Sequence, residues 1–127
     1  MNKVRLLKLA DYLDTLSTNS SHFDMGSWAF SYTPDSKIGE CGSAGCALGY
    51  ATNIFPELHL EWIKSKNGMY TGNITFDDSA GFLAAAKFFD LRNYESVKIF
   101  SYTNYPNPSR NITPQDVSRK IREMINE

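Results

Sequence analysis

A run of small residues near the middle of this 127-residue chain limits the folds open to it. The stretch 40–51 reads Glu-Cys-Gly-Ser-Ala-Gly-Cys-Ala-Leu-Gly-Tyr-Ala and holds both cysteines and three of the eight glycines. Its apolar spacing predicts a tight loop followed by a helix over about 44–55, which Pro56 ends. Gly45 and Gly49 would share one face of that helix. Because a glycine inside a helix costs about 1 kcal/mol relative to alanine, this pair indicates close backbone contact with another element.

Further helices and one β-hairpin are predicted around this stretch. Apolar residues recur at helical spacing in four other segments, namely 4–16, 79–89, 94–100 and a C-terminal stretch opened by Thr113 and Pro114. Alternating residues over 58–63, followed by the Asn67-Gly68 turn signal, predict a small antiparallel β-hairpin over roughly 58–76. The expected fold is therefore α+β, a single compact domain over residues 1–127 with about five helices.

Composition excludes several classes of protein. The formal net charge is −1, so no field of one sign favours duplex nucleic acid as a partner. No apolar run approaches the roughly 20 residues of a membrane helix. Lys8 and Asp11 interrupt the N-terminal apolar residues too early for a signal peptide, so a cytoplasmic location is expected. The Cys-x4-Cys spacing matches no common zinc pattern, and two cysteines are too few ligands for a structural zinc site. We therefore expect free thiols, no metal and no cofactor.

Several segments together resemble a family of small bacterial and phage proteins with a Cys-Gly-Ser/Thr-x-x-Cys-Ala-x-Gly motif. The resemblance is most specific over 41–51, and it also covers 23–28, 55–58, 84–91, 105–106 and the helix opened by Thr113-Pro114. The family pattern more often has Thr at Ser43 and Trp at Tyr50, and both changes keep the chemical type. By analogy, the phage association suggests a counter-defence protein that sequesters a nucleotide signal in the cytoplasm of a bacterial host.

The central motif also suggests an anion site. A glycine-rich turn that leads into a helix N-terminus presents free N–H groups and a partial positive charge. Gly42 and Ser43 would supply donors beside Cys41, Trp28 a stacking surface for a base, and Arg110 a counter-charge. No Gly-Lys-Ser/Thr follows, so this is not the Walker pattern. The sequence therefore favours non-catalytic binding of a small phosphorylated or nucleotide-like ligand.

Two alternatives stay open. In the first, the small residues only let the motif helix pack against residues 84–86. The protein would then be an adaptor or inhibitor that binds a host protein, or a homo-oligomer. In the second, Cys41 at the helix N-terminus would be the nucleophile of a hydrolase, with His22 or His59 as its base. Cys46 is expected to be a small buried hydrophobic residue inside the helix.

Overall fold

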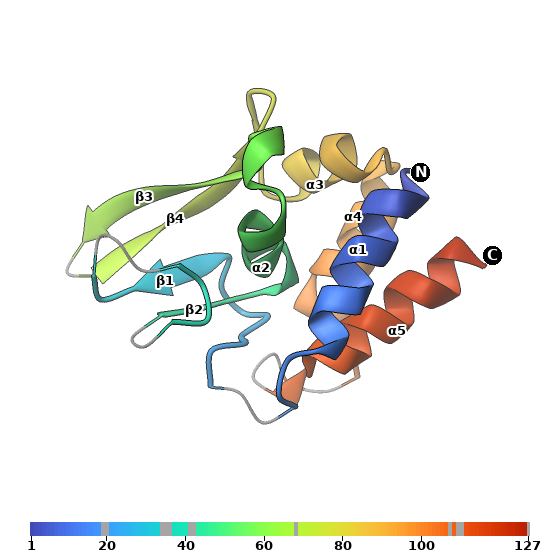
Figure 1. Ribbon diagram of the computed structural model, residues 1–127, viewed down its shortest axis with the longest axis horizontal. Coiled ribbons are helices and arrows are strands. Elements are labelled where there is room, and N and C mark those ends of the chain that lie inside the picture. The colour runs from blue at the N-terminus through green and yellow to red at the C-terminus, as the bar shows by residue number, and fades with distance from the viewer. Residues whose placement is uncertain are drawn as a thin grey trace.

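Helices and a β-sheet occupy opposite ends of the computed structural model, which describes residues 1–18, 21–33, 37–40, 43–67, 69–106, 108 and 111–126. The helices within these residues are α1 (Lys3–Asp14), α2 (Ala47–Ile54), α3 (Phe82–Phe89), α4 (Asn93–Phe100) and α5 (Pro114–Ile125), with 3₁₀ turns η1 (Pro56–Leu58) and η2 (Tyr102–Asn104). The strands are β1 (Ala29–Ser31), β2 (Ser43–Gly45), β3 (Glu61–Asn67), β4 (Met69–Phe76) and β5 (Ser79–Ala80). This arrangement confirms the predicted α+β fold (Figure 1).

The sheet is antiparallel, with strand order β2-β1-β4-β3 and with β5 paired to β4. Its longest ladder is the predicted hairpin, in which Trp62 lies opposite Ile74. The first strand begins three residues later than the sequence suggests, because 56–58 form a 3₁₀ turn that ends at His59 in the left-handed conformation (φ 62°). Strands β1, β2 and β5 were not predicted, since each has only two or three residues and no measurable alternation.

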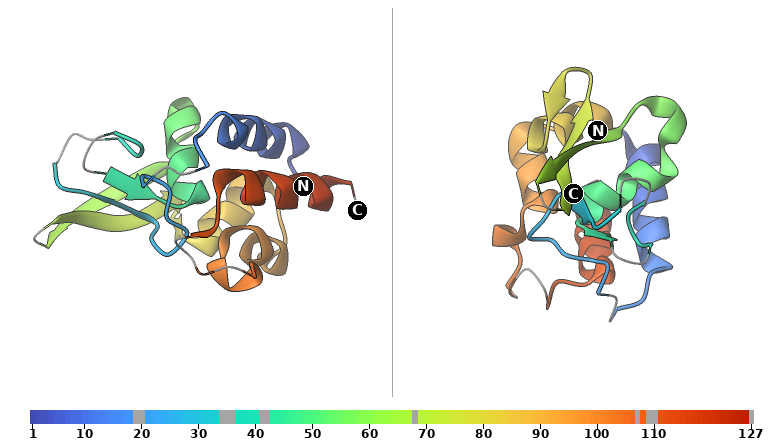
Figure 2. Two further views of the ribbon diagram at one scale, coloured as in Figure 1. Left: turned by 90° about the horizontal axis from the view of Figure 1, so that it is seen from below. Right: turned by 90° about the vertical axis from the view of Figure 1, so that its left-hand side faces the viewer.

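The helices α1 and α5 lie side by side at the other end of the molecule, where both chain termini are found (Figure 2). Thr113 begins α5 as predicted, since its hydroxyl accepts the Asp116 N–H at 3.1 Å and the Asp116 carboxylate accepts the Thr113 N–H at 3.0 Å. Gln115 then links the two helices, because its Nε2 donates to the carbonyl of Leu16 at 2.7 Å and that of Leu13 at 3.4 Å. This contact satisfies carbonyl groups at the C-terminal end of α1.

Aromatic rings fill the core between the sheet and the helices. Phe88 and Phe89 of α3 contact Phe55 at ring-centroid distances of 4.9 and 6.2 Å, and Phe89 stacks on Phe100 of α4 at 5.7 Å. Five of the eight residues of α3 are buried, as its nearly continuous apolar sequence predicts, whereas Leu83 and Lys87 are exposed. No helix in the described part of the chain has the length and apolar character needed to cross a membrane.

The predicted start of the central helix is wrong. Residues 43–45 form β2, and α2 begins only at Ala47, with Cys46 as its N-cap. Gly45 lies opposite Ala29 of β1, and on its other side its N–H donates to the His22 carbonyl at 3.0 Å. The small side chains therefore let an extended segment fit between β1 and the 22–24 segment, and tertiary hydrogen bonds replace the helical ones.

Candidate ligand-binding site

The carbonyl group of Trp28 is the point against which the small residues of the motif pack. A Cβ atom added to Gly49 would lie 2.2 Å from the Trp28 oxygen, and one added to Gly45 would lie 2.9 Å from it. The Cys46 N–H contacts the same oxygen at 3.4 Å and donates to the Ser27 carbonyl at 2.9 Å. The predicted close backbone approach is thus confirmed, although the neighbour is the segment that leads into β1. The two glycines do not share a helix face, because Gly45 lies in β2.

The indole of Trp28 is held by the start of α3. Gly81 has a positive φ of 62°, and an added Cβ there would lie 3.2 Å from Trp28 Cζ2. The Phe82 ring meets the indole edge-to-face, with centroids 4.9 Å apart and planes at 71°. Glycines near its backbone and side chain therefore fix the orientation of a half-buried tryptophan.

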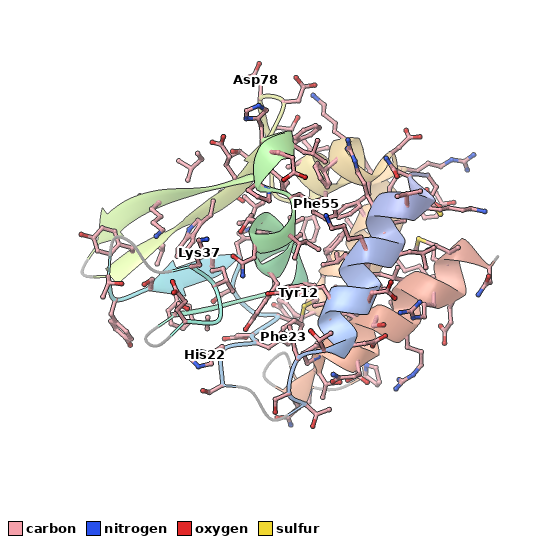
Figure 3. All side chains as sticks on the ribbon, viewed as in Figure 1. Tyr12, His22, Phe23, Lys37, Phe55 and Asp78 are labelled. Carbon is pink, nitrogen blue, oxygen red and sulfur yellow. The ribbon has the colours of Figure 1, made fainter. Side chains whose placement is uncertain are left out.

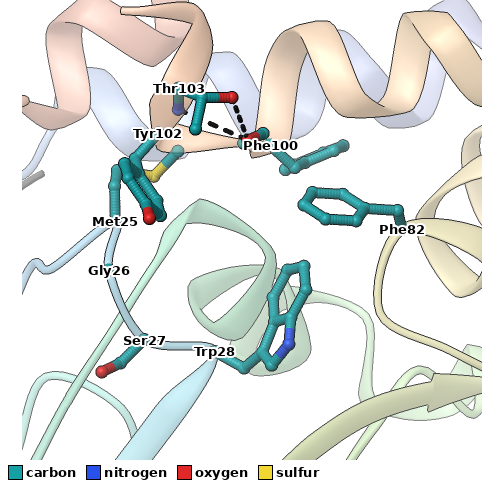
Figure 4. Close-up of a pocket in the computed structure, with 9 residues that line it drawn as sticks. Met25, Gly26, Ser27, Trp28, Phe82, Phe100, Tyr102 and Thr103 are labelled. Carbon is teal, nitrogen blue, oxygen red and sulfur yellow. Dashed lines mark hydrogen bonds between the residues drawn. The ribbon is translucent and has the colours of Figure 1, made fainter.

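This indole forms one wall of a cavity of about 360 Å³. The nine described residues that line it are Met25, Gly26, Ser27, Trp28, Phe82, Phe100, Ser101, Tyr102 and Thr103. Figure 4 shows Tyr102 and Met25 on the opposite side of the cavity from Trp28 and Phe82. Phe100 is only 2% exposed whereas Tyr102 is 49% exposed, so the cavity runs from the core to the surface.

Four of the nine described lining residues are aromatic, and a pair of neighbouring hydroxyl groups, from Ser101 and Thr103, adds polar character. Ser101 Oγ and Thr103 Oγ1 lie 2.8 Å apart, and Ser101 Oγ also accepts the Thr103 N–H at 3.3 Å (Figure 4). None of the nine lining residues that the structure describes is Lys, Arg, His, Asp or Glu. The described part of the lining therefore offers ring surfaces and hydrogen bonds, and no fixed charge.

The predicted site residues are not all brought together. Trp28 lines the cavity, whereas Ser43 does not. Ser43 is 4% exposed, and its Oγ lies 2.8 Å from the Lys37 carbonyl and 2.7 Å from the Glu40 carbonyl, so its hydroxyl closes the 37–40 loop. Cys41, Gly42 and Arg110 lie outside the described residues.

The N-terminal end of α2 does not face solvent. Residues 47–51 are all buried, and so is Cys46. Burial raises the pKa of the Cys46 thiol to about 11, against the opposing effect of the Gly49 and Leu48 N–H groups. Cys46 is therefore a buried neutral thiol as expected, although it caps α2 instead of lying within it.

The two histidines lie in different surroundings. Nδ1 of His22 is 2.7 Å from the carbonyl oxygen of Ser43. Because a carbonyl only accepts hydrogen bonds, Nδ1 carries the proton when the ring is neutral. Figure 3 shows His22 directed outward, whereas the neighbouring Phe23 lies toward Tyr12. The His59 side chain is 83% exposed at the end of η1.

Sequence reasoning missed most of the cavity. Phe82, Phe100 and the 101–103 segment come from distant parts of the chain, and their sequence patterns indicate only an apolar helix or a polar turn. Among the described residues, no three His, Cys, Asp or Glu side chains gather as metal ligands. Comparisons of this chain with family models, with curated proteins and with solved structures found no match.

Proposed function

We propose that the protein binds a small nucleotide-like ligand without converting it, and that the base of this ligand enters the Trp28 cavity. The observation that carries this proposal is a ring-lined cavity of about 360 Å³ that reaches from the core to the surface. Its volume falls within the roughly 300–1,000 Å³ common for small-molecule sites, which are usually apolar with a few placed polar groups.

Ring stacking is the main interaction available to such a ligand. Trp28 and Tyr102 lie on opposite sides of the cavity (Figure 4), so each offers aromatic surface to a flat ring that enters it. Stacking of a base on an aromatic side chain contributes about 1–3 kcal/mol by alanine substitution. The packing of Gly45 and Gly49 against the Trp28 carbonyl, and of Gly81 against its indole, supports the proposal further, because it positions this residue before any ligand arrives.

The composition of the lining favours binding over conversion. General acid–base chemistry uses groups such as histidine, carboxylates, lysine, cysteine or tyrosine. Tyr102 is the one residue of these types among the nine described lining residues. A counter-defence protein that sequesters a nucleotide signal is the concrete version of this role, and that version rests on the analogy with phage proteins alone.

Tryptophan fluorescence can test the proposal directly, because the chain has two tryptophans and only Trp28 lines the cavity. Trp62 Nε1 is buried without a hydrogen-bond partner among the described residues, so Trp62→Phe removes the second fluorophore and breaks no described hydrogen bond. We expect a nucleotide panel, including cyclic dinucleotides and adenosine diphosphate ribose, to change the fluorescence of this variant saturably. Mass spectrometry should recover the bound nucleotide unchanged.

Two substitutions serve as test and control. Trp28→Leu should weaken binding by about 1–3 kcal/mol, measured by calorimetry. Tyr94→Ala removes a 63%-exposed aromatic side chain outside the cavity and should leave the affinity unchanged. If no nucleotide changes Trp28 fluorescence, the proposal is wrong and the adaptor alternative becomes the one to pursue.

The hydrolase alternative keeps one supporting observation. His22 lies against Ser43, two residues beyond Cys41 in the sequence, with its Nδ1 proton fixed by the Ser43 carbonyl. If nucleotides are recovered as converted products, Cys41→Ala should abolish turnover and leave the affinity largely intact. Equal turnover by that variant would contradict a cysteine nucleophile.

A further inference from the structure

The Ser101 and Thr103 hydroxyl groups form a pair whose hydrogen-bonding capacity is only partly used. Their oxygens are 2.8 Å apart, so one hydroxyl donates to the other. Ser101 Oγ also accepts the Thr103 N–H. Their side chains make no other hydrogen bond with the described residues, and both residues line the cavity.

Counting protons and lone pairs shows what this pair can offer a ligand. Each hydroxyl has one proton and two lone pairs. If Thr103 donates to Ser101, the Ser101 proton stays available as a donor and the Thr103 lone pairs as acceptors. If Ser101 donates to Thr103, the Thr103 proton is the available donor, and each oxygen keeps one lone pair as an acceptor. In either arrangement the pair presents one donor beside at least one acceptor.

Adjacent donor and acceptor groups are complementary to the edge of a heterocycle that carries N–H beside C=O or a ring nitrogen. Nucleobases have such edges, and their flat faces suit the Trp28 and Tyr102 rings. Because either hydroxyl can donate to the other, the Ser101–Thr103 pair can present its donor and its acceptor in either order along the edge of a base. The polar and aromatic parts of the cavity therefore suit the same kind of ligand.

The lack of charge in the described lining argues against a phosphate inside the cavity. An ionised group that leaves water without a compensating charge or set of hydrogen bonds carries a large desolvation cost. The nine described lining residues supply no cation to offset it. The part of the ligand that enters should therefore be uncharged.

We infer that the cavity takes up only the uncharged nucleoside part of the ligand, so that a phosphate adds no affinity, and that the Ser101–Thr103 pair reads the edge of the base. This inference rests on the proposed function, and it narrows the recognised part of the ligand to the neutral base and its sugar. It also assigns Thr103 a role in specificity that the sequence motif does not suggest.

Matched pairs of ligands test the inference. The full chain is titrated by calorimetry with adenosine, guanosine, cytidine and uridine, and with the four corresponding 5′-monophosphates. We expect at least one nucleoside to bind as tightly as its monophosphate or more tightly. An analogue in which the edge N–H of that base is replaced by N–methyl should bind at least about tenfold more weakly.

A matched pair of variants tests the hydroxyl pair. Thr103→Val keeps the shape of the side chain and removes its hydroxyl, and it should weaken nucleoside binding about tenfold. Thr75→Val makes the same change on β4, outside the cavity, and should have no effect. Circular dichroism and urea unfolding of both variants show whether the fold is kept.

Each other outcome has a distinct meaning. A monophosphate that binds more than tenfold tighter than its nucleoside, with Trp28 fluorescence still responding, overturns the inference and leaves the proposed function standing. Full nucleoside affinity in Thr103→Val overturns the role of the hydroxyl pair. If neither nucleosides nor nucleotides bind, the proposed function itself fails.

Discussion

Replacing Gly49 by alanine should destabilise the protein, although the same change normally strengthens a helix. Gly49 lies inside α2, where alanine is favoured over glycine by about 1 kcal/mol. The added Cβ would lie only 2.2 Å from the Trp28 oxygen and 3.4 Å from its carbonyl carbon. The helix or the carbonyl must therefore shift by about 0.8 Å for the closer distance to reach even 3.0 Å, the lower limit for real Cβ contacts.

The energetic balance decides the sign of this effect. Overpacking of a well-packed interior typically costs about 1–3 kcal/mol. A displaced Trp28 carbonyl also weakens its contacts with the Cys46 N–H and with Cys46 Sγ, which lie at 3.4 and 3.7 Å. Together these losses exceed the gain in helix propensity, and we expect a net loss of about 1–2 kcal/mol in the free energy of unfolding.

Urea unfolding of Gly49→Ala in the Trp62→Phe background measures this loss, with Trp28 fluorescence as the probe. Gly45→Ala serves as a companion variant, because the added Cβ would lie 2.9 Å from the same Trp28 oxygen. Gly45 lies in strand β2, so this substitution gains no helix propensity. It should also destabilise the protein. A gain of about 1 kcal/mol in Gly49→Ala, with an unchanged Trp28 emission spectrum, would show that the Trp28 carbonyl does not restrict this position.

Two further substitutions test the buried thiol and the link between the terminal helices. Burial raises the pKa of the Cys46 thiol from 9.0 to about 11, so between these pH values the thiol ionises in the unfolded protein but not in the native one. The free energy of unfolding should therefore fall as the pH rises through this window, by up to about 2–3 kcal/mol. Cys46→Ala should remove this part of the slope in urea titrations from pH 8 to 11, and an identical slope in both proteins would mean that the native thiol ionises normally. Gln115→Met keeps the length of the side chain and removes its donor to the Leu13 and Leu16 carbonyls, so it should cost about 1–2 kcal/mol and speed amide exchange at the end of α1. Unchanged stability and exchange would contradict that link.

Much of the fold could be predicted because its signals are local. The α5 helix begins where Thr113, Pro114 and Asp116 satisfy its first N–H groups, and those residues are adjacent in the sequence. The β3–β4 hairpin follows from alternation over 58–63 and from the turn signal of Asn67 and Gly68. For the site, the sequence indicated Trp28 as an aromatic wall, and the structure places Trp28 against a cavity.

The sequence by itself thus determined the α+β class, the terminal and apolar helices and the hairpin, since each depends on periodicity or capping within a few residues. Only the tertiary structure decided that residues 43–45 are a strand, because a run of three small residues shows no strand periodicity and β1 supplies the backbone partners. It also decided the cavity, since residues 25–28, Phe82 and residues 100–103 meet only when α3 and α4 pack beside the sheet. Hydrogen bonds and contacts between distant segments leave no local pattern, so their partners emerge only from packing of the whole chain.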